Sequence, residues 1–138
     1  MLDTSTRTLF EAEHDAFRDT VRRVVATLDT DRHERECIVE REAWLQAGEA
    51  GMLCPTVPEE YGGLGLDFRF NAIVSEEASY AGSAVGWSLQ SDIVADYVLA
   101  YGSEEQKKKY LPRMVTGEAI TAIAMTEPGA GSDLQGMK

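Results

Sequence analysis

The sequence predicts an all-α fold, a helical bundle of about five to six helices. One C-terminal strand and a glycine-rich loop then begin a β-domain that is otherwise missing. Apolar residues recur at helical spacing through most of residues 9–115, and glycines and capping residues divide that pattern. Only residues 119–125 have the short, apolar, partly β-branched composition of a strand. We therefore expect a helical domain at residues 1–118 and the truncated start of a β-domain at residues 119–138.

The composition limits the class of protein. The chain has 138 residues, 43% hydrophobic and 27% charged, which is typical of one globular domain with its own core. A net charge of -11 argues against nucleic-acid binding, because phosphate contacts require a surplus of lysine and arginine. No apolar run approaches the roughly 18 residues of a membrane span, and the first residues lack the pattern of a targeting segment. The sequence predicts a soluble intracellular protein.

Two amphipathic helices are predicted first. Residues 9–28 and residues 38–50 place apolar side chains at helical spacing. The charged residues 29–36 between them are expected to form a connector or a frayed turn. Gly51 stands where a left-handed C-terminal cap is expected.

A shaped loop and a third helix follow. Residues 54–67 contain two prolines and three glycines, which excludes regular structure. Asp67 is predicted to cap the helix that follows it.

A longer helix is predicted from about Ser83 to Tyr101. It is apolar over more than one face, which indicates a central position in the bundle. Residues 103–106 have the form of a capping box that starts the next helix. That helix contains Pro112 and is expected to stop at Gly117.

The cysteines and histidines form no recognisable site. Cys37 and Cys54 are too few for a disulfide framework, and with His14 and His33 they lack the paired spacing of metal ligands. We expect reduced, mostly buried thiols and no metal site.

The glycine-rich stretch TEPGAGSDLQG at residues 126–136 fits none of three common motifs. It lacks the glycine spacing of a dinucleotide fingerprint, the lysine of a P-loop and the glycines of a nucleophile elbow. Gly129 and Gly131 still permit close backbone approach to a ligand, and Thr126 and Ser132 supply hydroxyls. Residues alone leave two alternatives open, an anion-binding loop and a simple tight turn.

The same stretch, read as AMTEPGAGSDLQG over residues 124–136, resembles the first signature of the acyl-CoA dehydrogenases. VPEEYGGLG at residues 57–65 and GSEEQKKKYLPRMVTGE at residues 102–118 are similar to that family in order and spacing, and the combination resembles the long-chain type. The resemblance implies a subunit with an N-terminal helical domain, a middle β-domain and a C-terminal helical domain, of which this chain would cover the first third. The lone strand would then belong to the middle domain.

The resemblance implies FAD as cofactor and a binding segment in this chain. Met125 and Thr126 would lie against the isoalloxazine ring, with simple core packing as the alternative for Met125, and Gly131 and Ser132 would face the pyrophosphate. Ser132 would also lie near bound acyl-CoA. Ala95 and Leu99 would line the fatty-acyl cavity, or simply pack in the core. The whole predicted segment comprises Ile123, Ala124, Met125, Thr126, Glu127, Pro128, Gly129, Ala130, Gly131 and Ser132.

The implied reaction is the α,β-dehydrogenation of an acyl-CoA thioester in fatty-acid β-oxidation. The family's glutamate base would come from the C-terminal domain, so no catalytic residue is assigned here and the fragment itself is expected to be inactive. Glu127 and Asp133 are interpreted as turn residues. An electron-transfer flavoprotein and a homo-oligomer, dimer or tetramer, are the implied partners. The expected location is the bacterial cytoplasm, or the mitochondrial matrix in a eukaryote.

Two alternatives remain at the level of the sequence. Flavin monooxygenases and nitroalkane oxidases share the fold and use oxygen as acceptor. A short, non-enzymatic helical binding module is the other alternative, although an exposed strand edge would favour aggregation or pairing.

Overall fold

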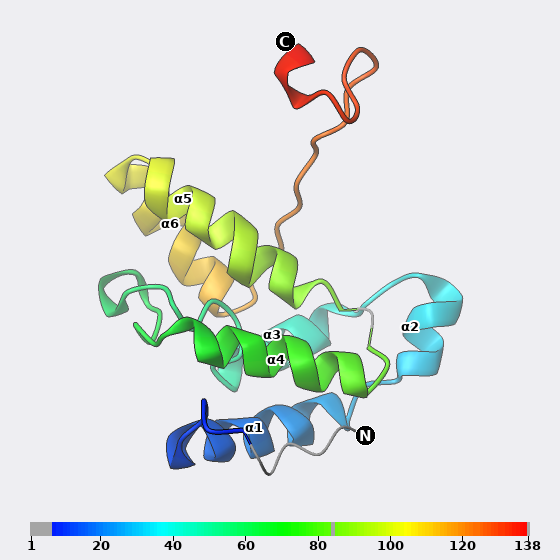
Figure 1. The fold of residues 1–138 in the computed structure, drawn as a ribbon, viewed down its shortest axis with the longest axis vertical. Coiled ribbons are helices and arrows are strands. Elements are labelled where there is room, and N and C mark those ends of the chain that lie inside the picture. The colour runs from blue at the N-terminus through cyan, green and yellow to red at the C-terminus, as the bar shows by residue number, and fades with distance from the viewer. Residues whose placement is uncertain (1–6, 84, 138) are drawn as a thin grey trace.

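The computed structural model describes residues 7–83 and 85–137. These residues form six α-helices, one π-helical turn and two short 3-10 helices, and no strand. Figure 1 shows α1 lying along α4, α5 beside α6, and the C-terminal segment projecting away from the helices. None of the described helices is long and apolar enough to cross a membrane. In chain order the elements are α1 (Ala12–Val25), α2 (Thr30–Glu36), α3 (Arg41–Glu49), η1 (Glu59–Tyr61), α4 (Phe68–Tyr80), η2 (Leu89–Val94), α5 (Ala95–Tyr101), α6 (Glu104–Val115) and η3 (Leu134–Gly136).

Several helix ends are those that the sequence predicts. The Asp67 carboxylate accepts a hydrogen bond from the Arg69 amide at 2.9 Å and starts α4. At the start of α6, the Ser103 amide donates to the Gln106 side chain and the Gln106 amide donates to the Ser103 hydroxyl, which completes the capping box. Gly51 has the left-handed φ of +71° that was expected after α3.

The charged connector predicted at residues 29–36 is instead a helix, α2. The Asp29 carboxylate caps it by accepting from the Arg32 amide at 3.0 Å. His33 is buried, with its ring Nε2 2.6 Å from a carboxylate oxygen of Glu40. The helix was not predicted because its residues are charged or polar, and its one buried side chain, His33, gives no apolar pattern.

The longest predicted helix begins later and is interrupted. Helical backbone starts at Trp87 instead of Ser83, and the π-helical turn η2 precedes α5. The expected central position is wrong for one face, because Tyr97 is 56% exposed and Tyr101 is 82% exposed. Periodicity identifies apolar side chains, but it does not show whether another segment covers them.

The apolar core has two parts, and each fully buried large side chain stabilises the fold by about 1.5–3 kcal/mol. The first, between α1, α3 and α4, contains Val21, Val24, Val25, Trp44, Ala47, Met52, Leu53, Ile73, Val74 and Trp87. The second, between the loop after α3 and helices α5 and α6, contains Cys54, Val57, Tyr61, Ala95, Leu111 and Met114. The expectation of mostly buried thiols is correct only for Cys54, because Cys37 is exposed; both thiols are free.

A chain of ion pairs joins α1 to α4. Arg18 is buried and donates to Glu76 at 2.6 Å and to Glu77 at 2.5 Å, and Arg22 Nε lies 2.9 Å from Glu77. Burial pushes the pKa of Glu76 upward, but hydrogen bonds and charges from Arg18 and Arg7 outweigh burial and hold this pKa below its ordinary value. The apolar spacing of residues 9–28 gave no indication of these ion pairs.

The strand predicted at residues 119–125 does not form in the described part of the chain. Residues 120–126 carry no regular structure, and the one backbone bridge nearby joins Glu127 to Ala130. A strand needs the N–H and C=O groups of a neighbouring strand. Figure 1 shows this segment running away from the helices, where no other described segment lies beside it.

Candidate functional site

The segment that carries the glycine-rich motif starts from a close backbone contact between α6 and α3. Gly117 follows α6 with a φ of +77°, and a Cβ at this position would collide with the carbonyl oxygen of Trp44. A Cβ on Gly48 would likewise collide with the backbone of Thr116. The two glycines therefore let the end of α6 lie directly on α3.

Hydrogen bonds hold the first residues of the segment. The Ala119 amide donates to the carbonyl of Arg113 at 2.8 Å, and the Arg41 guanidinium donates to the carbonyl of Glu118 at 2.6 Å. The exit from α6 is thus held both by α6 itself and by α3.

The last of these attachments is made by Gln90, a fully buried residue of η2. Its side-chain oxygen accepts from the Thr121 amide at 3.0 Å and from the Thr121 hydroxyl at 3.2 Å. Its side-chain nitrogen donates to the carbonyl of Met114 in α6 at 2.8 Å. Gln90 was not among the predicted site residues; the signal that could have found it is that it is the only amide side chain in the predicted helix at residues 83–101.

Beyond Thr121 the segment is open to solvent. Ile123 is 37% exposed and Met125 is 45% exposed, and Ala124 and Thr126 are exposed as well. None of the amides of residues 122–126 has a hydrogen-bond partner among the described residues. The segment therefore presents apolar side chains, a hydroxyl and unpaired amides to a ligand or to another segment.

The motif itself closes a tight turn. The Glu127 amide donates to Ala130 at 2.9 Å, and the Ala130 amide donates back to Glu127 at 3.1 Å, with Pro128 and Gly129 at the tip. A Cβ on Gly129 or on Gly131 would meet nothing within 4 Å, so both glycines border open space. The exposed glycine backbone can approach an anion closely.

Two predicted residues flank this turn. Ser132 is exposed. Asp133 precedes η3, but its side chain makes no capping hydrogen bond there.

The structure places Ala95 and Leu99 on the core side of α5. Ala95 is fully buried in the second core cluster, and Leu99 packs half-buried against the same cluster. The opposite side of the helix carries an open depression of about 280 Å³ that the sequence did not indicate. It is lined by Asp92, Ile93, Asp96, Tyr97, Ala100 and Tyr101.

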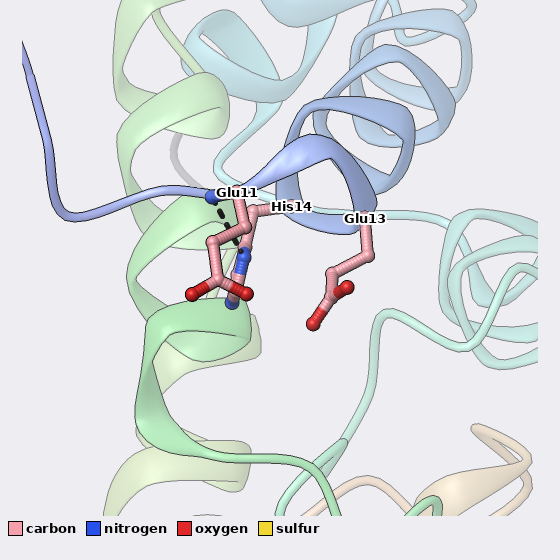
Figure 2. A group of neighbouring side chains, drawn as sticks. All are labelled: Glu11, Glu13 and His14. Atoms are coloured by element: carbon pink, nitrogen blue, oxygen red, sulfur yellow. Dashed lines mark hydrogen bonds between the residues drawn. The ribbon is translucent and has the colours of Figure 1, made fainter.

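A second group of polar side chains lies at the start of α1. Figure 2 shows Glu11, Glu13 and His14, whose potential ligand atoms lie within 4.8 Å of one another. The His14 Nδ1 atom already accepts a hydrogen bond from the Glu11 amide at 3.1 Å, and the Glu11 carboxylate lies 3.9 Å from the guanidinium of Arg69. The ring also packs on Phe70. These contacts are those of a capped helix start.

Comparison with known proteins gives consistent matches. The long-chain specific acyl-CoA dehydrogenase of Sus scrofa mitochondria is 46% identical over 142 aligned residues, which include all of this chain and 33% of that protein. An acyl-CoA dehydrogenase structure from Geobacillus kaustophilus superposes with a TM-score of 0.85 at 47% identity, covering 94% of this chain and 35% of that one. An acyl-CoA dehydrogenase from Bacillus anthracis, solved in complex with FAD, superposes with a TM-score of 0.77 at 37% identity, covering 94% and 23%.

The chain spans about a third of the length of the curated relative described above. Residues 11–118 match the acyl-CoA dehydrogenase N-terminal domain, which covers all six α-helices of the structure. The chain therefore belongs to the acyl-CoA dehydrogenase family.

Proposed function

We propose that this chain is part of an FAD-dependent acyl-CoA dehydrogenase that carries out the α,β-dehydrogenation of acyl-CoA thioesters in fatty-acid β-oxidation. The observation that carries the proposal is the family match over residues 11–118, followed by a solvent-exposed segment that ends in the TEPGAGSD motif. Residues 119–138 are proposed to begin the next domain of the complete subunit.

Residues 123–132, termed here the flavin segment, have a chemistry that fits FAD. The flavin ring is flat and largely apolar with a polar edge, and the exposed side chains of Met125 and Thr126 offer one apolar and one hydrogen-bonding surface. The pyrophosphate is an anion, and the open backbone at Gly131 and the hydroxyl of Ser132 suit an anion. Burial of Met125 and Ile123 against the cofactor would also remove apolar surface from water.

In the proposed reaction, bound FAD would accept the hydride from the substrate β-carbon. The flavin segment orients the ring and holds its position relative to the substrate, which lowers the entropic cost of reaction. No residue of this chain is assigned as the base that takes the α-proton. Glu127 forms part of the tight turn, and its backbone hydrogen bonds with Ala130 support a structural role.

A long-chain acyl-CoA is the proposed substrate. The similarity to a long-chain specific dehydrogenase supports this choice. Ser132 is proposed to contact the acyl-CoA. Ala95 and Leu99 remain predictions for the acyl cavity, and the burial of Ala95 in the core leaves it little surface for such a contact. An electron-transfer flavoprotein is proposed as acceptor, and a dimer or tetramer as the assembly.

The experiment that tests the proposal uses the complete subunit, purified with FAD and mixed anaerobically with acyl-CoAs of increasing chain length. Loss of the oxidised flavin absorbance is expected, fastest with long chains. A flavin that stays oxidised with every acyl-CoA would contradict the proposed activity. Rapid reoxidation of the reduced flavin by air would identify an oxygen-using relative instead.

A further inference from the structure

We propose that Gln90 is a positioning residue for the cofactor site: by holding Thr121, it fixes the point from which the flavin segment extends. The inference rests on the proposed function, because it concerns residues that would contact FAD.

The side chain of Gln90 is fully buried and uses both ends of its amide. Its nitrogen faces the carbonyl of Met114, which can only accept, so its oxygen must face Thr121. That oxygen accepts two hydrogen bonds, from the amide and from the hydroxyl of Thr121. One side chain thus joins η2, the end of α6 and the start of the exposed segment.

The position of Gln90 in a π-helical turn is consistent with a functional role. Such turns are rare and often occur at functional sites. The next residue of the turn, Ser91, is also buried, and its hydroxyl accepts a hydrogen bond from the Cys54 amide at 2.9 Å. Ser91 therefore stabilises the loop after α3, whereas Gln90 reaches the exposed segment.

Among the described residues, Thr121 is the last one before the flavin segment that makes a hydrogen bond to the helices. The amides of residues 122–126 have no hydrogen-bond partner among the described residues, so in this part of the structure no backbone hydrogen bond from these amides holds the chain between Thr121 and the turn at Glu127. Ile123 lies only two residues beyond Thr121, a reach of at most about 7 Å. Without Gln90 the unrestrained part of the segment would begin at an earlier residue. FAD binding would then have to order more residues, which lowers the affinity for FAD.

Three substitutions in the complete subunit test this inference. Gln90→Met keeps the shape of the side chain and removes all three hydrogen bonds, and Thr121→Val removes only the hydroxyl bond. Ser91→Ala is the matched control, because it removes one buried hydrogen bond from the same turn without touching the segment. The readouts are the dissociation constant for FAD, the visible circular dichroism of the bound flavin, and the melting temperature.

We expect Gln90→Met to weaken FAD binding about tenfold and to change the flavin circular dichroism, since two lost hydrogen bonds to the segment correspond to roughly that factor. Thr121→Val should weaken binding by about twofold to threefold. Ser91→Ala should lower the melting temperature but leave FAD affinity and the flavin spectrum unchanged.

Unchanged FAD affinity and spectrum in Gln90→Met, with a melting temperature lowered as in Ser91→Ala, would overturn the inference and make Gln90 a core residue only. If Gln90→Met yields no folded protein, Thr121→Val decides, and wild-type affinity in that variant overturns the inference. An unmodified subunit that binds no FAD would refute the proposed function itself and this inference with it.

Discussion

Replacement of Gly117 by alanine should destabilise the chain strongly, because the position combines two demands that only glycine meets. The φ of +77° lies in the left-handed region, which costs a residue with a Cβ about 1–2 kcal/mol. The new Cβ would also collide with the carbonyl oxygen of Trp44. This backbone atom can yield only if α6 moves away from α3, and overpacking of this kind costs about 1–3 kcal/mol. The expected loss is therefore about 2–5 kcal/mol.

Gly82 offers a matched control for the backbone conformation. It has a similar φ of +68°, but a Cβ there would meet nothing within 4 Å. Gly82→Ala should therefore lose only about 1–2 kcal/mol, the cost of the left-handed conformation. The difference between the two variants measures the close approach of α6 to α3.

At Gly48, the effect of the close contact on stability and the effect of helix propensity have opposite signs. Gly48 lies inside α3, where alanine is favoured over glycine by about 1 kcal/mol. Its Cβ would collide with the backbone of Thr116, so Gly48→Ala should destabilise the chain in spite of that preference.

Urea unfolding of the chain, followed by the fluorescence of the buried Trp44 and Trp87, measures these differences. With a slope of about 1–3 kcal/mol per molar urea, Gly117→Ala should lower the midpoint by about 1 M or more. Equal midpoints for Gly117→Ala and Gly82→Ala, or a stabilised Gly48→Ala variant, would refute the close backbone contact.

Three further predictions concern charge, thiols and the flavin segment. The arginine partners of Glu76 outweigh its burial and hold its pKa below the ordinary value. The stability that Glu76 contributes should therefore be fully present above the ordinary pKa and be lost as the pH falls through the lowered pKa. In acid unfolding, the Glu76→Gln variant should lack the loss of stability that comes from protonation of Glu76. Burial raises the pKa of Cys54 to about 12, whereas Cys37 is exposed. A thiol reagent at pH 8 should therefore modify Cys37 alone in the folded chain and both thiols in denaturant. Rapid reaction of Cys54 in the folded chain would contradict its burial. Thr126→Val should weaken FAD binding by the complete subunit about threefold to tenfold, whereas Thr8→Val, at an exposed threonine before α1, should not.

Features that depend on one or two neighbouring residues could be predicted from the sequence. The Asp67 cap, the Ser103 capping box and the left-handed Gly51 each follow from a local backbone requirement. The motif at residues 124–136 was also visible, because its residue types are contiguous. Its exposure was not predicted.

Features that depend on distant partners could not be predicted. Arg18 is buried because Glu76 and Glu77 meet it from another helix, and no spacing within α1 shows this. Gln90 and Thr121 are separated by 31 residues, so their contact exists only in the fold. The predicted strand failed for the same physical reason, because pairing requires a neighbour that the described residues do not supply.

Hydrogen exchange along the complete subunit, with and without FAD, tests the central claim most directly. Bound FAD should slow the exchange of the amides of residues 122–132, because this segment is proposed to lie against the cofactor, while α1 and α4 stay unchanged. FAD that binds without slowing exchange anywhere in residues 122–132 would contradict the assignment of the flavin segment.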